Sequence, residues 1–429
     1  MTIFIGQCGV QIGTNFWEQL LYEHDINPDG FSQLKKTDFE SVHEPFAFFN
    51  VTKENRYEAK NGLFRSLFNP LSFIHGKEEA ANNYARGRFI VGGELHEPIV
   101  ERIRKELEAT DNCQGFVINH SIGGGTGSGL TMRVMEHLTN VYSKAVAVQV
   151  PILPSEYLST AVVDPYNAVL HCGSNMPYSN LTIMMDNAAI MSLLSRHLQI
   201  EKPTVIFLNR LISQIQSCLF CGFHYNADPI CSTLEEVTTN LVPFPSLHFA
   251  YLRYAPIVGT PRQDFQTAVH PAEELTKAAL SPNYSTLSAD KFPRSKVIST
   301  CLSFRGAAAG WQRGLAAAIL HSKISQSLSF VDWCPTGVKI AIHAVPPLRP
   351  VPESCLAESP ANLTMLVNGT AATQRALQTI NAQFSRLYER RCFVHWYVGE
   401  GMEEGEFTEA SDVVTNIISQ YNNAEASER

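Results

Sequence analysis

Residues 120–130, His-Ser-Ile-Gly-Gly-Gly-Thr-Gly-Ser-Gly-Leu, decide the fold class of this chain. An apolar run at 115–118 leads into the glycines, and residues 130–138 leave them with helical spacing. Glycine lets another group approach the backbone closely. A strand, a glycine loop and a helix start form an anion cradle, because backbone N–H groups and the helix dipole point at one spot. We expect the loop to bind phosphate through backbone amides and the hydroxyls of Thr126 and Ser128.

The loop matches two common phosphate motifs only in part. Gly123 and Gly125 fit the start of the dinucleotide fingerprint G-x-G-x-x-G, but its third glycine is displaced. A Walker loop ends in Gly-Lys-Ser/Thr, and no lysine lies between Glu106 and Lys144. The acidic residue that would bind a nicotinamide ribose is also missing, which disfavours an oxidoreductase. A glycine-rich turn without a ligand remains the structural alternative.

Composition restricts the class of protein. The chain has 429 residues, enough for two or three domains, with 45% hydrophobic and 17% charged residues. Its formal charge of −8 argues against a nucleic-acid partner, and no apolar stretch approaches the roughly 20 residues of a membrane span. Among ten cysteines, Cys218, Cys221 and Cys231 with His224 come closest to a metal set. We expect reduced cytosolic thiols and no protein-bound metal there.

Short apolar runs alternate with amphipathic stretches in the first half of the chain. This alternation predicts a parallel sheet covered by helices, an α/β fold. After residue 240, prolines separate strand-like runs. The expected helices are 10–21, 98–107, 204–222, 370–390 and 405–420, and an expected strand is 145–150.

The motifs, taken in order, resemble those of tubulins nearly from end to end. They are GQCGVQIG (6–13), GKEEAANNYARG (76–87), GGGTGSG (123–129), STAVVDPYN (159–167), NRLISQI (209–215), TNLVPFP (239–245), FVDWCPTGVKI (330–340) and FVHWYVGEGMEEGEF (393–407). The chain is most similar to α-tubulins, on the basis of YEHDINPDG (22–30), VVDPYN (162–167) and the long insert between Ile342 and Leu366.

The resemblance implies three domains and a cytoskeletal function. A Rossmann-like GTP-binding domain with a parallel sheet would span 1–187, a core helix and mixed α+β intermediate domain 188–365, and a C-terminal helical hairpin 366–429. The implied function is that of a GTP-binding structural subunit of microtubules in the cytoplasm, cilia or basal bodies. Its implied partners are β-tubulin and the microtubule lattice, with no nucleic acid and no membrane.

The resemblance also assigns nucleotide contacts residue by residue. The glycine loop would wrap the phosphates, the 79–82 segment would face the terminal phosphate, and two asparagines would read the guanine edge. The implied GTP contacts are Gln7, Cys8, Gln11, Glu79, Asn82, Ser121, Gly123, Gly124, Gly125, Thr126, Gly127, Ser128, Thr160, Asp164, Asn187 and Asn209. Each asparagine alone could equally be a helix cap or a surface polar group.

A catalytic carboxylate is implied four residues before Asn240. α-Tubulins carry there a glutamate that orients water against GTP on the next β subunit, and Glu236 has this spacing, with Glu235 beside it. A carboxylate can position water while backbone amides hold phosphate charge. Without that anchored spacing, two glutamates on a helix would indicate a solvated face. The implied enzyme is a GTP hydrolase of the tubulin type that acts in the assembled polymer.

Several positions depart from the α-tubulin pattern. Two acidic residues that help to hold Mg²⁺ are replaced by Asn50 and Thr52, which argues against a tightly bound Mg²⁺. Val205 stands where the family stacks a tyrosine on guanine, a loss worth about 1–3 kcal/mol of binding. Five residues precede Gly6 and the end lacks a glutamate-rich tail, so we expect a shortened first strand and no tail-reading partners. The alternative function is a non-polymerising or capping relative that serves as an interaction module.

Overall fold

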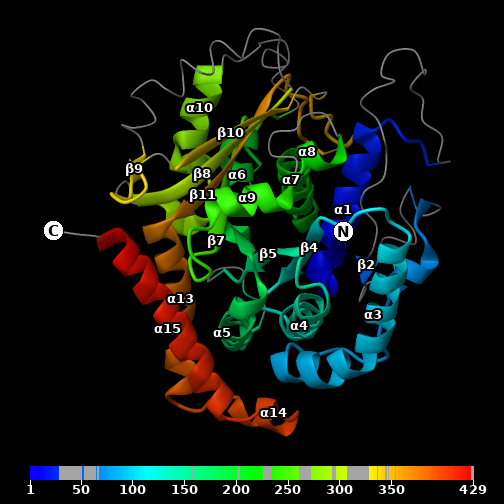
Figure 1. The fold of residues 1–429 in the computed structure, drawn as a ribbon, viewed down its shortest axis with the longest axis vertical. Coiled ribbons are helices and arrows are strands. Elements are labelled where there is room, and N and C mark those ends of the chain that lie inside the picture. Colours follow the sequence, from blue (N-terminus) through cyan, green and yellow to red (C-terminus); the bar gives the residue numbers. More distant parts are fainter. Residues whose placement is uncertain are drawn as a thin grey trace.

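The computed structural model describes residues 1–28, 51–52, 64, 67–155, 159, 161–200, 203–225, 233–259, 272–291, 296–306, 328–335, 337–343, 345, 347–352 and 354–426. A nine-stranded sheet runs through the middle of the molecule (Figure 1). Its order is β1-β4-β5-β6-β7-β11-β8-β10, with β9 paired to β8. Neighbouring strands are parallel except beside β11, which is antiparallel to both β7 and β8. The strands are β1 Thr2–Phe4, β4 Gly115–Ser121, β5 Val146–Leu153, β6 Leu181–Asp186, β7 Phe249–Ala255, β8 Lys296–Arg305, β9 Ser329–Phe330, β10 Val338–His343 and β11 Asn362–Gly369, and a separate pair joins β2 Val51–Thr52 to β3 Phe73–Ile74.

Helices cover both faces of this sheet because its strands are apolar on both sides. In β4, Val117 packs into one core, whereas Phe116 and Ile118 pack into another on the opposite face. The first core holds α1 Gly6–Glu23, α6 Asn187–Leu198 and α7 Val205–Leu219; the cores on the other face hold α3 Gly92–Glu108, α4 Thr131–Val141, α5 Asp164–Asn175 and α10 Ala272–Leu280. The α/β fold expected from the alternation is confirmed.

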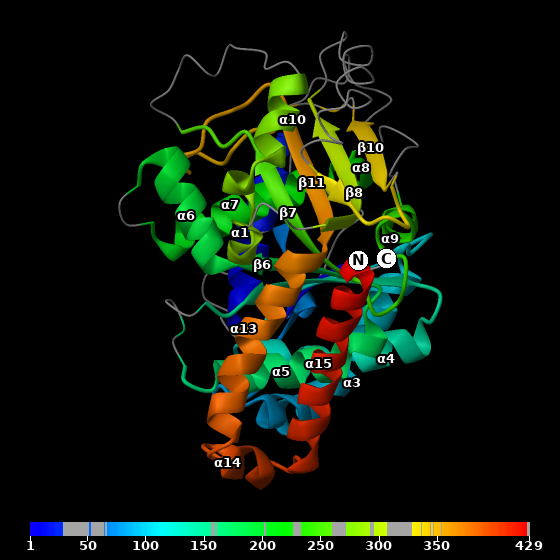
Figure 2. The same cartoon turned by 90° about the vertical axis from the view of Figure 1, so that its left-hand side faces the viewer.

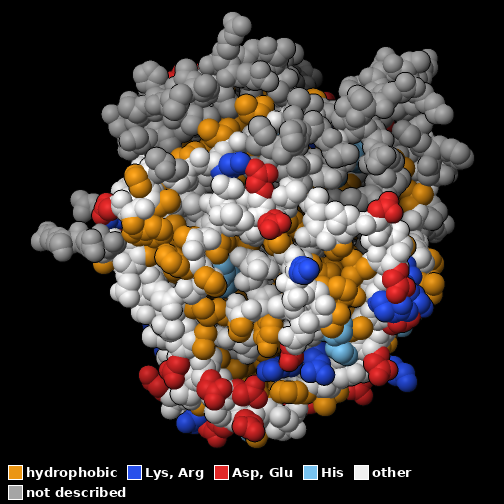
Figure 3. Space-filling model, viewed as in Figure 1, with side chains coloured by type: hydrophobic (Ala, Val, Ile, Leu, Met, Phe, Trp, Pro, Cys, Tyr) orange, Lys and Arg blue, Asp and Glu red, His pale blue; other side chains and the backbone are white. Residues whose placement is uncertain are grey.

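The C-terminal helices form a pair that packs on α5. α13 Thr370–Tyr388 and α15 Gly405–Ala426 lie side by side, with the short α14 Val394–Gly399 at one end (Figures 1 and 2). The aromatic rings of Tyr166 and Phe407 contact each other at 5.2 Å between centroids, within the core that joins the pair to α5. Acidic side chains gather at the end formed by α14 and the start of α15 (Figure 3). The helices expected at 370–390 and 405–420 are present.

Two boundaries that were expected at prolines are wrong. The helix expected from Pro98 begins at Gly92, and a π-helical segment, Arg86–Val91, leads into it. The strand expected to close before Pro151 continues to Leu153. β5 pairs with β6 at Gln149 and next at Ile152, and the two residues between them have no partner on β6. Pro151, which lacks an N–H, is one of these two residues, so it interrupts no pairing there.

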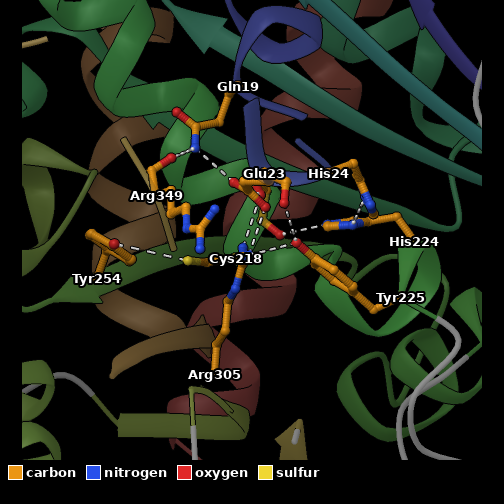
Figure 4. Close-up of polar contacts among 10 residues, drawn as sticks. Gln19, Glu23, His24, Cys218, His224, Tyr225, Tyr254, Arg305 and Arg349 are labelled. Carbon is orange, nitrogen blue, oxygen red and sulfur yellow. Dashed lines mark hydrogen bonds and ion pairs between the residues drawn. The ribbon is translucent and has the colours of Figure 1, made fainter. Parts of the chain in front are cut away.

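A buried ion pair ties the end of α1 to the far half of the sheet (Figure 4). Arg305, the last residue of β8, donates to Glu23 Oε2 at 2.7 Å, and both side chains are buried. Glu23 Oε1 also accepts hydrogen bonds from Ser217 and Gln19. Burial alone would raise the pKa of Glu23, but the Arg305 charge and the hydrogen bonds from Arg305 and Ser217 hold it below its usual value. Short α8, Cys221–His224, closes this cluster beside Tyr225.

Candidate functional site

The candidate nucleotide site lies at the carboxyl edge of the parallel strands. β1, β4, β5 and β6 all run in one direction, so the segments that follow them emerge at the same edge. Ligands of open α/β sheets bind in the crevice outside these carboxyl ends. Gln7 lies in the first turn of α1, Ser121 ends β4, Asp164 begins α5 and Asn187 begins α6. The sheet therefore brings residues from four distant parts of the sequence to one edge.

The glycine loop packs so closely that side chains are excluded from most of it. A Cβ at Gly125 would lie 2.5 Å from the backbone nitrogen of Asn83, and one at Gly127 would collide with the carbonyl of Ser121. Gly6, at φ +75°, approaches the backbone of Gly127 from the start of α1. A Cβ at Gly124, in contrast, would meet no atom within 4 Å. The loop is thus braced on one side and open at Gly124, as a phosphate cradle requires.

The hydroxyl of Ser128 forms a hydrogen bond inside the glycine loop. It donates to the carbonyl of Gly124 at 2.5 Å, and the side chain is fully buried. A serine that bonds back by four residues is common in helical turns. Ser128 therefore braces the loop from within, while Thr126 is also buried in it.

The segment at 81–84, which precedes the π-helical residues Arg86–Val91, faces the glycine loop and has an unusual backbone conformation. Ala81 and Asn82 have φ values of +47° and +53°, a region that residues other than glycine rarely adopt. Asn83 accepts hydrogen bonds from the Ala85 N–H at 2.9 Å, which fixes the start of the helical segment. The side chains of Glu79 and Asn82 are exposed. Such backbone strain persists only where the surroundings hold it.

Two aspartates shape the rim of the site. The carboxylate of Asp164 lies next to Gly123 and accepts a hydrogen bond from the Ser159 hydroxyl at 2.6 Å. Burial raises the pKa of Asp164. Asp186 caps α6 by accepting from the Ala188 N–H at 2.9 Å, which sets Asn187 at the helix start.

The remaining residues predicted to contact the nucleotide lie in the amino-terminal halves of α1 and α7. The two helices pack against each other, with Gln11 half-buried and Asn209 buried. Burial raises the pKa of the Cys8 thiol to about 12, which disfavours its thiolate form at neutral pH. Val205 is 59% exposed at the head of α7. Thr160 and Asn50 lie outside the described residues, as does the side chain of Thr52.

Sequence reasoning missed Asn167, whose side chain forms four hydrogen bonds within the described part of the chain. It lies on α5, three residues after Asp164, and its fully buried amide donates to the carbonyls of Asn82 and Gly123. In the sequence, residues 162–167 indicate only the resemblance to a family motif. The available signal is an asparagine three residues after the aspartate that begins α5.

The predicted catalytic glutamate lies at the opposite edge of the sheet. Thr233 caps α9 Leu234–Leu241 by accepting from the Glu236 N–H, and α9 ends against the amino end of β8, where Ser299 donates to the carbonyl of Leu241 at 2.7 Å. Glu236 Oε1 lies 2.6 Å from Lys339 Nζ on β10. A seven-residue strand such as β7 spans about 23 Å. The glycine loop and Glu236 are therefore separated by the length of the strands.

Lys339 has no sequence signal that pairs it with Glu236, since 103 residues separate the two.

Among the described residues, no group of three or more His, Cys, Asp and Glu side chains is arranged to hold a metal ion. The same part of the chain has no helix with the length and apolar character needed to cross a membrane.

A parallel sheet with an open glycine loop at its carboxyl edge defines a nucleotide-binding α/β protein of the Rossmann-like class. Comparison with known proteins is specific: the Tubulin/FtsZ family GTPase domain matches residues 1–195, and the tubulin C-terminal domain matches residues 245–382. The chain is 38% identical over 434 residues to the tubulin alpha chain of Eremothecium gossypii, covering 97% of this chain and 95% of that one. It belongs to the tubulin family and is an α-tubulin-like, GTP-binding cytoskeletal subunit with a GTPase domain.

Proposed function

We propose that this chain pairs with β-tubulin, enters microtubules, and supplies Glu236 to GTP hydrolysis on the neighbouring subunit. The observation that carries this proposal is the opposite placement of the two halves of the site. The glycine loop lies at the carboxyl edge of the sheet, and α9 with Glu236 lies at the amino edge. A head-to-tail contact would bring one subunit's carboxylate to the next subunit's phosphates, and such contacts generate filaments.

Both ends of the molecule carry exposed apolar side chains suited to this contact. At the α9 end, Phe244 and Trp333 are 55% and 40% exposed and their rings lie 6.0 Å apart. At the nucleotide end, Trp396 is 63% exposed, and its backbone carbonyl accepts a hydrogen bond from Asn83. Large exposed aromatics are enriched at protein interfaces. Exposed aromatic side chains at opposite ends support a subunit with a neighbour at each end.

The resident nucleotide in this proposal is GTP, held with the residues of the carboxyl edge. Backbone amides of the glycine loop would bind its phosphates, and Asn187 and Asn209 would contact the base. Mg²⁺ binds proteins through one or two carboxylates together with phosphate oxygens. Glu79 and Asp164 are two of the carboxylates that the described residues place at this edge. We expect these carboxylates to support Mg²⁺ mainly through its bound waters and the nucleotide phosphates. The microtubules of this proposal are those of the cytoplasm, the cilium or the basal body.

The test compares Glu236→Gln with Glu235→Gln in polymers formed with β-tubulin and GTP. Glu235 is an adjacent, exposed carboxylate on the same helix, so its variant controls for the loss of one charge. We expect Glu236→Gln to lower phosphate release about a hundredfold, because a positioned base contributes about 10²–10⁴ in rate. Nucleotide content and co-sedimentation should remain unchanged. Equal phosphate release by the two variants would contradict the role of Glu236.

The alternative, a non-polymerising interaction module, is favoured by Val205. An exposed valine at the head of α7 offers no aromatic face for a base. This alternative predicts a chain that neither forms a heterodimer with β-tubulin nor pellets with microtubules. Acid release of bound nucleotide from the purified chain separates the two functions further, since a GTP-binding subunit should carry close to one nucleotide per chain.

A further inference from the structure

The side chain of Asn167 forms four hydrogen bonds that join separate segments around the phosphate site. Its Nδ2 donates to the carbonyl of Asn82 at 2.8 Å and to that of Gly123 at 2.6 Å. Its Oδ1 accepts from the Tyr84 N–H at 3.0 Å and from the Tyr397 hydroxyl at 2.7 Å. An amide has two N–H donors and an oxygen with two lone pairs, so every hydrogen-bonding position of this side chain is used.

These bonds hold the 81–84 segment against the glycine loop. The Asn82 and Gly123 carbonyls, 41 positions apart in sequence, are bound by the two hydrogens of one amide group. The glycine loop is also braced by its own close backbone contacts, as at Gly127. The 81–84 segment has strained backbone at Ala81 and Asn82. The segment therefore depends on Asn167 more than the glycine loop does.

Helix α14 fixes the orientation of Asn167. Tyr397 is buried, and its hydroxyl can donate to Oδ1 only while the amide is turned with its hydrogens toward the two carbonyls. The same helix receives a hydrogen bond from Asn83 to the Trp396 carbonyl at 3.0 Å. The glycine loop, the 81–84 segment and α14 thus form one hydrogen-bonded unit around a single asparagine.

We propose that Asn167 is a positioning residue that sets the preference of this site for a nucleoside triphosphate over a diphosphate. This inference rests on the proposed GTP binding, in which the Asn82 segment faces the terminal phosphate. If the hydrogen bonds of Asn167 are lost, the 81–84 segment is no longer held in place and its contact with the terminal phosphate weakens. The glycine loop still binds the phosphates that both nucleotides share. A purely structural role would weaken the binding of both nucleotides by the same factor.

The experiment measures dissociation constants of mant-GTP and mant-GDP on the full chain. Tyr397→Phe removes only the hydroxyl that orients Asn167, and Tyr421→Phe is its matched control. Tyr421 is also buried on a C-terminal helix, and its hydroxyl bonds to the backbone of Phe249, away from the phosphate segments. We expect the ratio of the GDP to the GTP dissociation constant to fall about threefold in Tyr397→Phe and to stay unchanged in Tyr421→Phe.

A second pair of variants tests the amide directly. Asn167→Asp keeps the shape of the side chain but replaces both N–H donors with an oxygen, and we expect the ratio to fall tenfold or more. Asn362→Asp is the control, because Asn362 is equally buried and donates only to the Tyr254 hydroxyl among the hydrogen bonds described. Thermal melting without nucleotide separates a loss of folding from a loss of discrimination.

The outcomes distinguish this inference from the proposed function. A wild-type chain that binds neither nucleotide would overturn the proposed GTP binding, and this inference with it. A wild-type chain that prefers the triphosphate, with Tyr397→Phe retaining that preference or losing affinity for both nucleotides equally, would overturn the positioning role alone. If Asn167→Asp does not fold, the Tyr397→Phe result decides.

Discussion

Replacing Arg305 with methionine should remove a large part of the stability of this protein. Arg305 donates to Glu23 at 2.7 Å, to Ser217 at 3.1 Å and to Tyr225 at 3.4 Å, and its guanidinium lies 5.3 Å from the centre of the Tyr225 ring (Figure 4). Methionine fills a similar volume but carries no charge. The variant therefore leaves the buried carboxylate of Glu23 without its cation, with hydrogen bonds from Ser217 and Gln19 remaining.

The expected loss is about 4 kcal/mol in the free energy of unfolding. At an effective dielectric constant of 20, charges 2.7 Å apart attract by about 6 kcal/mol. The remaining hydrogen bonds to Glu23 offset part of this loss. Removing one partner of a buried pair typically costs about 3–5 kcal/mol. The double variant Glu23→Gln/Arg305→Met should recover at least half, because no unpaired charge then remains inside the protein.

Urea unfolding followed by tryptophan fluorescence measures these changes. With a slope of about 3 kcal/mol/M, a loss of 4 kcal/mol shifts the midpoint by about 1.3 M. Arg349→Met is the control, because Arg349 pairs with Asp25 at 2.9 Å while half-exposed, and such pairs contribute at most about 1 kcal/mol. A loss below 1 kcal/mol in Arg305→Met, or a double variant no more stable than the single one, would refute this account.

Two further predictions concern the glycine loop and acid stability. Gly124→Ala should fold normally yet bind GTP at least tenfold more weakly, because its methyl group would enter the open space of the phosphate cradle. Gly125→Ala should melt at a clearly lower temperature, because its methyl group meets the Asn83 backbone. Nucleotide titration and thermal melting separate the two effects, and a Gly124→Ala chain with normal affinity would place the phosphate elsewhere. Burial lowers the pKa of His224 to about 3 and that of His248 to about 4, from 6.5. The unfolded chain therefore binds more protons below pH 6.5, and stability should fall there by about 1.4 kcal/mol per histidine per pH unit. Thermal melts at pH 7.0 and 5.5 check this, and equal melting temperatures would contradict it.

Much of the fold, and the glycine loop of the candidate site, follow from local sequence. The glycine loop, its flanking strand and helix, and the two C-terminal helices are encoded by neighbouring residues, since hydrophobic period and glycine placement act over a few positions. The boundaries expected at Pro98 and Pro151 are wrong because they were inferred from neighbouring residues alone. Whether a proline interrupts a helix or strand depends on where the neighbouring element needs a hydrogen bond, as the gap in the β5–β6 ladder shows.

The roles of single side chains were decided by the tertiary structure. Glu23 and Arg305 are 282 positions apart, Glu236 and Lys339 are 103 apart, and Asn167 meets Tyr397 across 230. No local pattern records such pairs, because a buried polar group needs a partner of the right geometry but not of any particular sequence distance. The placement of the glycine loop and Glu236 at opposite edges likewise follows from strand direction and sheet order. The local sequence therefore specifies a glycine loop and a carboxylate, and the folded sheet places them at opposite edges.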